Sequence, residues 1–346
     1  MRNYRSEIDA ALRGEAPEHV PFSIYAEGII PEGFDLPSLQ ARGLALHRRP
    51  PCYEQHTEDV EWSEEKVAED VTKVTVKTAI GALTYVWQRA TLGTKQLEHP
   101  IKTLDDYRIA EFIVQHTSYK PVYDKFLAAE RETGDAGVCV AHGPYSPLVD
   151  IQLWWLGQEA FCYEITDHED AVLGLCEVMR RKHREFFALL AKGPARYVQY
   201  CGNVVPGMIG PDRIRRHVLP CWNELGDMLH EEGKLYGCHL DADNRQMIDI
   251  VRDSNFDFIE AFTPPPDCSV SVAEARTVWP NKRLWLNFPS SVHIAGDGTI
   301  RRATREILAQ AGDRKGFLLG ITEDVPANDM RRSLSCILDV LKEHNS

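Results

Sequence analysis

The chain has 346 residues, of which 43% are hydrophobic and 26% charged, proportions that are ordinary for a globular protein with a sizeable core. Its length suits either two domains or one α/β barrel of about 250 residues that carries an insertion. The formal net charge of −13 disfavours binding to nucleic acids or anionic membranes, because no surplus of cations is available to neutralise phosphates.

Short apolar runs recur along the chain with the length and composition of strands that are buried on both faces of a parallel sheet. In chain order they lie at 20–26, 137–143, 197–203, 234–240, 256–262, 283–288 and 316–322, with a weaker eighth candidate near 44–47. Longer helical patterns lie between them. This alternation predicts right-handed βαβ units and a parallel sheet. We therefore predict a closed (β/α)8 TIM barrel, with an open doubly wound sheet as the alternative.

Three of the helical patterns have recognisable ends. An amphipathic helix is predicted after Asp167, which has the character of an N-cap residue. A second helix is predicted over 211–233, with a kink at Pro220 and an end at a glycine. A third is predicted over 330–343.

Segment 58–90 departs from the alternation of strands and helices. Its apolar and polar residues alternate on both sides of Ile80-Gly81, which is typical of an antiparallel hairpin. We interpret this hairpin as an insertion in the N-terminal third of a single barrel domain that spans residues 1–346.

The sequence also predicts the cellular compartment. No stretch approaches the ~20 apolar residues of a membrane-spanning helix, and the first twenty residues are too charged for a signal peptide. The nine cysteines are scattered without any C-x-x-C spacing. These features predict a cytoplasmic protein with reduced thiols, and exclude a disulfide scaffold or a zinc ribbon.

Polar residues follow the predicted strands at their carboxyl ends, where barrel enzymes place their catalytic groups. Each could simply mark the point where a strand reaches solvent, but the whole set favours a site. Its members are Tyr25, Glu27, His142, Cys201, Asn203, His239, Asp241, Asp243, Glu260, Asn287, His293, Glu323 and Asp324.

The sharpest local pattern is the His239-Leu240-Asp241 segment. Residues two apart on an extended strand point to the same side, so the imidazole of His239 and the carboxylate of Asp241 should point the same way. With Glu260 and Glu323 at later strand ends, they could converge on a divalent ion such as zinc. The alternative is a histidine that is simply hydrogen-bonded to Asp241. Cys238 should point to the opposite face, which disfavours it as a nucleophile.

Several segments together carry a family resemblance. They are ALRGEAPEHVPF near the start, KTAIGALTYV followed by EHPIKTLDDY, GPYSP at 143–147, HEEGKLYGCHLDAD, and GFLLGITEDVP. In their order and spacing the chain resembles the uroporphyrinogen decarboxylase-like superfamily, and within it the corrinoid-dependent methyltransferases. The arginine-rich motif of the decarboxylase should follow the first strand, where this chain reads IYAEGIIPEG. The prediction is therefore an acidic mouth without arginine, unsuited to a substrate with eight carboxylates.

The resemblance also implies a ligand set. Coenzyme M methyltransferases of this superfamily bind zinc through an H-x-C pair and a later cysteine. Here the pair falls on His239 and Asp241, and the last cysteine falls on Glu323, or on Thr322 if the alignment shifts by one. Oxygen ligands in place of thiolates make a harder, more Lewis-acidic metal, which favours an oxygen-centred substrate. The first-component methyltransferases of anaerobic O-demethylase systems fit this expectation.

The implied reaction moves a methyl group from an aryl methyl ether to the cob(I)alamin of a separate corrinoid protein. Zinc would activate the ether oxygen as a Lewis acid. The resemblance implies three groups of residues: metal ligands His239, Asp241 and Glu323, with Glu260 as fourth ligand or orienting partner; catalytic His239, Glu260, His142 and Asn203; and substrate-binding Tyr25, Asn287, Trp154 and Trp155.

Two alternatives remain open on the sequence alone. The first is a related corrinoid methyltransferase that acts on another methyl donor or acceptor, such as a methylamine or a thiol. The second is a barrel without catalytic activity that binds a corrinoid or an aromatic ligand. In that protein the histidine and the acidic residues would be hydrogen-bonded pairs without a metal.

Overall fold

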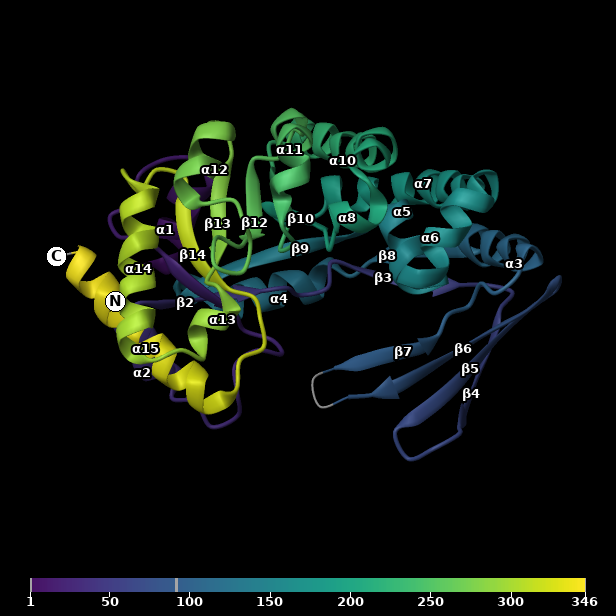
Figure 1. Ribbon diagram of the computed structural model, residues 1–346, viewed down its shortest axis with the longest axis horizontal. Coiled ribbons are helices and arrows are strands. Elements are labelled where there is room, and N and C mark those ends of the chain that lie inside the picture. The colour runs from purple at the N-terminus through teal and green to yellow at the C-terminus, as the bar shows by residue number, and fades with distance from the viewer. Residues whose placement is uncertain (1, 91–92, 346) are drawn as a thin grey trace.

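A computed structural model describes residues 2–90 and 93–345 of the chain. Eight parallel strands close into a barrel in the spatial order β1-β14-β13-β12-β11-β10-β9-β2 (Figure 1). The strands are β1 (Phe22–Tyr25), β2 (Leu44–Arg48), β9 (Gly137–Tyr145), β10 (Tyr197–Cys201), β11 (Leu235–His239), β12 (Phe258–Phe262), β13 (Arg283–Asn287) and β14 (Phe317–Ile321). Each coincides with a predicted run, including the weak one near 44–47. The predicted TIM barrel is confirmed, and the open sheet is excluded.

The barrel interior is filled with apolar side chains at its amino-terminal end. Phe258, Trp285 and Leu318 pack there against Ile8 and Leu12 of helix α1 (Tyr4–Leu12). Because side chains on one face of a strand recur every second residue, the next inward positions lie nearer the carboxyl end. Helix α1 and this apolar layer therefore close one end of the barrel, and a ligand can enter only from the other.

Helices and helical turns connect the strands and cover the barrel. Those before β9 are α2 (Leu36–Arg42), α3 (Leu104–Gln115), α4 (Tyr123–Thr133) and η1 (Gly134–Ala136). Those between β9 and β11 are α5 (Pro147–Asp150), η2 (Ile151–Leu156), α6 (Gln158–Asp167), α7 (Glu169–Lys192), α8 (Pro206–Ile209), α9 (Pro211–Arg213), η3 (Ile214–Val218) and α10 (Leu219–Glu231). The later ones are η4 (Asn244–Met247), α11 (Ile248–Asp253), α12 (Val272–Val278), α13 (Ser290–His293), α14 (Asp297–Ala311) and α15 (Ala327–Asn345).

The structure corrects two details of the predicted helices. Asp167 is not the N-cap of α7, because it is the last residue of α6, and His168 occupies the cap position. The helix predicted over 211–233 contains a π-helical turn, η3, just before Pro220. A proline without a backbone N–H disrupts the regular hydrogen-bond ladder of the preceding turn, which accounts for this irregularity.

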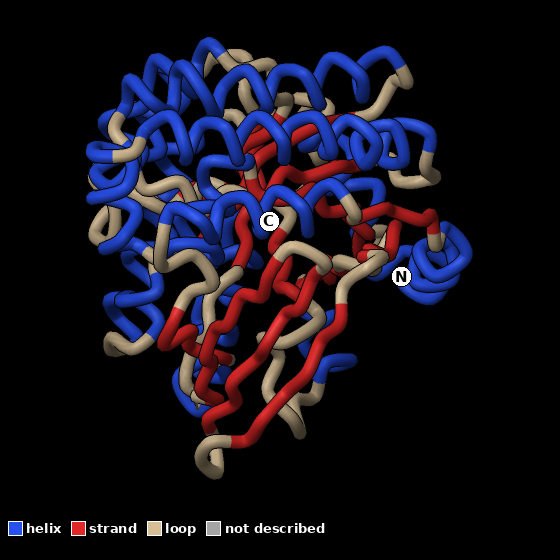
Figure 2. The backbone as a smooth tube through the Cα atoms, turned by 90° about the vertical axis from the view of Figure 1, so that its right-hand side faces the viewer, coloured by secondary structure: helices blue, strands red, loops and turns tan. Residues whose placement is uncertain are grey.

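The inserted segment forms more than the predicted hairpin. Strands β5 (Val71–Thr78) and β6 (Gly81–Arg89) pair around Ile80-Gly81 as expected, but β4 (Glu61–Lys66) and β7 (Thr94–Glu98) extend them to a four-stranded antiparallel sheet. A two-stranded sheet of β3 (Tyr53–Thr57) and β8 (Thr117–Pro121) connects this insertion to the barrel. The four-stranded sheet projects from the barrel beside α3 in Figure 1, and its long strands extend beyond the helices in Figure 2.

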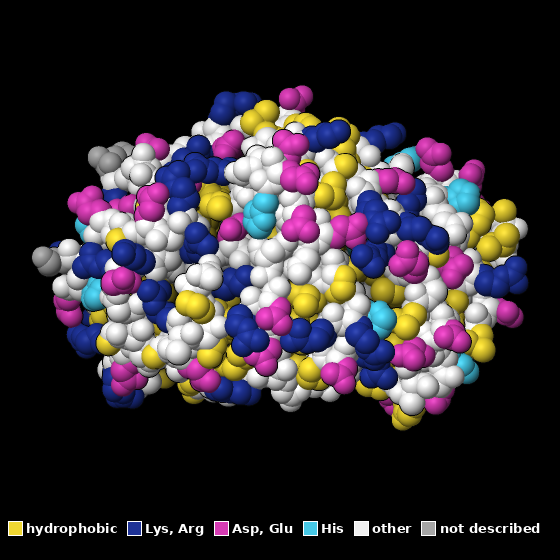
Figure 3. Space-filling view, turned by 90° about the horizontal axis from the view of Figure 1, so that it is seen from above, with side chains coloured by type: hydrophobic (Ala, Val, Ile, Leu, Met, Phe, Trp, Pro, Cys, Tyr) yellow, Lys and Arg dark blue, Asp and Glu magenta, His cyan; other side chains and the backbone are white. Residues whose placement is uncertain are grey.

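The surface carries both signs of charge in close mixture. On the face shown in Figure 3, acidic side chains are interspersed among basic ones, and several basic side chains adjoin one another on the right of the view. Among the described residues, no helix has the length and apolar character needed to cross a membrane.

Candidate functional site

A cavity of about 360 Å³ lies at the carboxyl ends of the barrel strands, and we call it the mouth cavity. It is lined by residues from four barrel strands (β1, β9, β10 and β11) and from loops that follow barrel strands, including those after β2 and β14. Among the predicted site residues it brings together Tyr25, Glu27, His142, Cys201, Asn203, His239, Asp241, Glu323 and Asp324. The carboxyl ends of strands that are far apart in sequence therefore meet here, as the strand-end rule predicted.

Glu260 is the centre of a hydrogen-bond network at the base of this cavity. Its side chain is fully buried, and it is paired in register with His239 on the neighbouring strand. Tyr25 Oη donates to one carboxylate oxygen at 2.7 Å. Gln199 Nε2 donates to the other at 2.7 Å, and His239 Nδ1 lies 2.6 Å from that same oxygen. Glu260 therefore fixes the imidazole ring, whose Nε2 lies 3.5 Å from Asp241 Oδ2.

The carboxylates around His239 change its protonation. Burial by itself would lower the pKa of His239, but the charges and hydrogen bonds of Glu260 and Asp241 raise it to about 10. Burial raises the pKa of Glu323, and the nearby Asp241 charge raises it further. Glu260 and Asp241 thus flank one imidazolium, and the carboxyl group of Glu323 lines the same cavity.

Other polar groups of the mouth cavity are available to a ligand. Burial, together with the positive charge of Arg49, lowers the pKa of His142 to about 3, so this ring is neutral. Its Nδ1 lies 3.7 Å from Cys201 Sγ. Within the described part of the chain, His142 Nε2, Gln199 Oε1 and Thr322 Oγ1 are buried without a hydrogen-bond partner. Such buried groups are uncommon, which favours a polar ligand at this position.

The backbone approaches closely where β10 ends. A Cβ atom on Gly202 would lie 1.4 Å from the backbone oxygen of His239, so only glycine fits between these strands. The next residue, Asn203, has a φ of 49° and donates from Nδ2 to Tyr145 Oη at 3.3 Å. A left-handed backbone at a non-glycine residue is uncommon and recurs at functional sites.

Some predicted site residues do not line the mouth cavity. Asn287 is buried, donates to Thr263 Oγ1 at 3.2 Å, and accepts from the backbone N–H of Thr322 at 3.0 Å. It therefore holds the loop that carries Glu323. His293 is buried and hydrogen-bonded to a serine on α15, and Asp243 caps the η4 turn. Trp154 and Trp155 line a different cavity, next to the inserted sheet.

Sequence reasoning missed Arg49, and its prediction of a mouth without arginine is wrong. Arg49 follows β2, lines the mouth cavity, and places its guanidinium 3.8 Å from the centre of the Tyr25 ring. The strand-end rule, applied to the weak strand near 44–47, would have found it. The rejection of an eight-carboxylate substrate does not depend on this error, because a single arginine neutralises only one charge.

The chemistry of the donor set fits a divalent cation, although the donors are not fully assembled. His239 Nε2 and Asp241 both face the cavity, and Glu260 holds the other imidazole nitrogen in the way that carboxylates orient metal-binding histidines. In the described part of the chain, three donors within 4.8 Å of one another occur at Glu7, Glu18 and His19, not in the mouth. Glu323 must therefore move closer to complete a site with His239 and Asp241.

Comparison with known proteins supports the fold. No family model matches the sequence, and no curated protein does. The structure is similar to a methyltransferase from Methanosarcina mazei, with a TM-score of 0.63 and 12% identity over 100% of both chains. A B12-independent methionine synthase from a Shewanella species matches 84% of this chain and 77% of its own, at 10% identity, but its TM-score is only 0.40. The similarity to the Methanosarcina protein covers the whole chain and shows that the two proteins share a fold. The TM-score of the second match is too low to support an argument.

Proposed function

We propose that the protein is a methyltransferase that moves the methyl group of an aryl methyl ether to the cob(I)alamin of a separate corrinoid protein. The observation that carries this proposal is the Glu260–His239–Asp241 array at the open end of the barrel. The motifs shared with corrinoid-dependent methyltransferases support it, as does the similarity in fold to the Methanosarcina methyltransferase.

The reaction sets a clear requirement for the site. A cobalt–carbon bond forms as the methyl carbon–oxygen bond breaks, and the electron pair of the broken bond remains on the aryl oxygen, which leaves as a phenolate. The site must therefore stabilise negative charge on that oxygen. The guanidinium of Arg49 lines the mouth cavity and provides positive charge there. His239 gives up its proton when it binds a metal, so the metal ion would take over its positive charge.

The proposed metal would be held by His239, Asp241 and Glu323. Zinc bound by these nitrogen and oxygen donors would supply Lewis acidity toward the departing oxygen. Glu260 is better suited to orient His239 than to bind the metal, because it is fully buried below the cavity and already accepts from Tyr25 and Gln199. These contacts restrict the imidazole to one orientation, with Nε2 toward the cavity.

The remaining polar groups would position the substrate. His142 is neutral and can donate or accept a hydrogen bond through Nε2, and Asn203 lies beside Tyr145 on the same cavity wall. Because α1 closes the opposite end of the barrel, the corrinoid of the partner must approach the mouth cavity from the carboxyl end of the strands.

A metal and methyl-transfer experiment tests the proposal. Purified wild-type protein should contain close to one zinc per chain by mass spectrometry, and should transfer methyl from an aryl methyl ether to free cob(I)alamin. The His239→Ala variant should lose both properties. His230→Ala is the matched control, because His230 forms a similar pair with Asp257 at 2.8 Å on the outside of the barrel. Undiminished transfer by His239→Ala would refute the assignment.

One observation favours a second candidate, a barrel that binds its ligand without catalysis or metal. Both nitrogens of His239 already have carboxylate partners, Glu260 at 2.6 Å and Asp241 at 3.5 Å. In that protein, zinc would be absent after purification in zinc-containing buffer, and neither an aryl ether, a methylamine nor a methylthiol would be demethylated. Turnover of the amine or the thiol in place of the ether would instead identify a related methyltransferase.

A further inference from the structure

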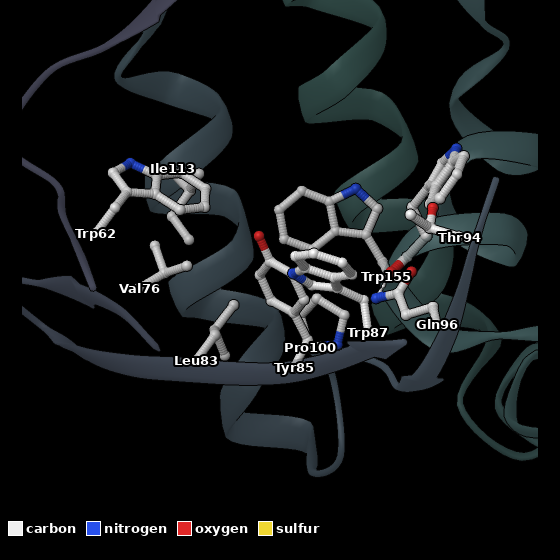
Figure 4. A pocket seen from close by; sticks show the side chains of 11 residues that line it. Trp62, Val76, Leu83, Tyr85, Trp87, Thr94, Gln96, Pro100, Ile113 and Trp155 are labelled. Atoms are coloured by element: carbon white, nitrogen blue, oxygen red, sulfur yellow. Dashed lines mark hydrogen bonds between the residues drawn. The ribbon is translucent and has the colours of Figure 1, made fainter. Parts of the chain in front are cut away.

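A second cavity, of about 460 Å³, lies between the inserted sheet and the helices beside it, and we call it the aromatic cavity (Figure 4). Strands β4 to β7 supply one wall, and helix α3 and the π-helical turn η2 supply the other. Its volume is in the range of small-molecule binding sites, about 300–1,000 Å³. It shares no lining residue with the mouth cavity.

The walls of this cavity are mainly aromatic. Trp62, Tyr85, Trp87 and Trp155 line it, and none of its lining residues is charged. In Figure 4, Trp62 lies at one end near Val76, whereas Thr94 and Gln96 lie at the other end. The cavity is thus apolar over most of its length and polar at one end. It suits a molecule with an apolar body and a single polar end.

Two features indicate that these aromatic side chains are positioned for a ligand rather than for packing alone. Trp62 and Trp154 are 51% and 49% exposed, which leaves a large apolar area in contact with water. In addition, the indole N–H groups of Trp62, Trp87 and Trp154 have no acceptor among the described residues. By contrast, Trp155 donates to Asp150 at 3.1 Å. Indole groups that combine exposed apolar area with an N–H group free of protein acceptors are typical of recognition surfaces.

The wall formed by η2 is held in place by hydrogen bonds. The backbone oxygen of Trp154 accepts from Gln96 Nε2 at 3.2 Å and lies 3.2 Å from His99 Nδ1, which connects η2 to β7 and to the segment after it. The backbone oxygen of Trp155 accepts from the N–H of Ile101 at 3.0 Å. The two walls are therefore joined, and the cavity is organised before a ligand binds.

We propose that the aromatic cavity binds a planar aromatic molecule that carries a polar group at one end. Aromatic rings from opposite walls offer their faces and edges to a flat ring, which gains from stacking as well as from burial. No acidic side chain lines the cavity, which favours a neutral ring body over a cation. The polar end of the ligand lies toward Thr94 and Gln96.

This site is separate from the reacting centre of the proposed methyltransferase. The connection is indirect: the Trp154 ring lies 6.5 Å from the ring of Tyr145, which lines the mouth cavity and accepts from Asn203. A molecule in the aromatic cavity is therefore not held at His239. The proposal goes beyond the proposed function and does not require it to be correct.

Calorimetric titration with two matched probes tests the proposal. The probes are 4-methoxybenzoate, which is flat, and trans-4-methoxycyclohexanecarboxylate, which has similar polar groups but no aromatic ring. We expect saturable binding of the flat probe, with an affinity at least about tenfold higher than that of the saturated one, which corresponds to ~1.4 kcal/mol. Absence of binding at millimolar concentrations, or equal affinity for both probes, would overturn the proposal.

Variants locate the bound probe. Trp87→Ala should weaken binding of 4-methoxybenzoate by about tenfold or more, Trp87→Phe should retain most of it, and Ile294→Ala is the control for an exposed apolar side chain outside the cavity. Circular dichroism verifies that each variant is folded. His239→Ala should bind the probe normally, so failure of this proposal is distinguishable from failure of the proposed function. Binding that is lost in His239→Ala and kept in Trp87→Ala would place the probe in the mouth cavity and overturn the inference.

Discussion

Replacement of Glu260 by alanine is the most direct test of the network at the barrel mouth. The carboxylate is fully buried and satisfies Tyr25 Oη, Gln199 Nε2 and His239 Nδ1 at 2.6–2.7 Å. The substitution leaves two neutral donors and one imidazolium without their acceptor. It also removes a buried negative charge from beside a positive one.

The expected cost follows from these contacts. Net hydrogen bonds to charged groups contribute ~1.5–3 kcal/mol each, and removal of one member of a buried ion pair costs ~3–5 kcal/mol. The three contacts share one carboxylate and are not additive, so we expect a loss of about 4 kcal/mol at pH 7. This is a large part of the 5–15 kcal/mol that typically stabilises a folded protein.

Urea unfolding of metal-free protein, followed by far-UV circular dichroism, measures this loss. Glu231→Ala is the control, because Glu231 is an exposed glutamate on α10 and its removal should change stability by less than about 0.5 kcal/mol. The double variant Glu260→Ala/His239→Ala should lose less than the sum of the single variants, because the unpaired imidazolium is removed. A loss below about 1 kcal/mol for Glu260→Ala would refute the network as described.

Three further predictions address the surroundings of the two cavities. Gly202→Ala should lower stability by at least about 3 kcal/mol, because its methyl group would collide with the backbone of His239. Gly207→Ala is the control and should have almost no effect on stability, because no atom lies within 4 Å of the added methyl group. Thermal unfolding compares the two variants. Burial raises the pKa of Asp150 to about 6 from 3.8 in an unfolded chain, so the folded state binds the proton more tightly and stability falls as the pH rises from about 4 to 6. Asp150→Asn should abolish this fall and stabilise the protein at pH 7 by up to ~3 kcal/mol, because each pKa unit corresponds to about 1.36 kcal/mol. If stability depends on pH in the variant as it does in the wild type, this prediction is wrong. Asn287→Ala removes two buried hydrogen bonds and should cost ~1–3 kcal/mol, with faster hydrogen exchange at the first backbone amide after β14; protection equal to wild type would exclude this positioning role.

The barrel could be predicted from the sequence because its strands are buried on both faces. A strand such as Phe317–Ile321 is buried at every position, and this produces the continuous apolar run that marks it. The inserted sheet was only partly predictable. Val71–Thr78 alternates between buried and less buried residues, whereas Glu61–Lys66 is exposed at all six positions and carries no pattern of burial. Its pairing comes from the neighbouring strand rather than from its own side chains.

The sequence could predict which residues line the mouth cavity only where they lie at the end of a recognisable strand. His239 and Asp241 lie where the two-residue period places them, and Cys238 lies in the hydrophobic core on the other face. The positions of Trp154 and Trp155 could not be predicted, because they follow β9 in a π-helical turn whose side-chain directions differ from those of a regular helix. Asn287 also ends a strand, but hydrogen bonds to its neighbours turn its amide away from the cavity.

The depth of the candidate site follows from the two-residue period of the strands. Phe258 lies in the apolar layer, and Glu260, two residues further along the same strand, lies in the polar network. On the next strand, the apolar Trp285 is likewise followed two residues later by a buried polar residue, Asn287. Below this boundary the interior is closed by aromatic rings and α1. Above it, the ends of β1, β9, β10 and β11 reach the mouth cavity. The hydrogen-bond network of Glu260 therefore lies directly below the opening of the barrel, and His239 lies between Glu260 and the mouth cavity.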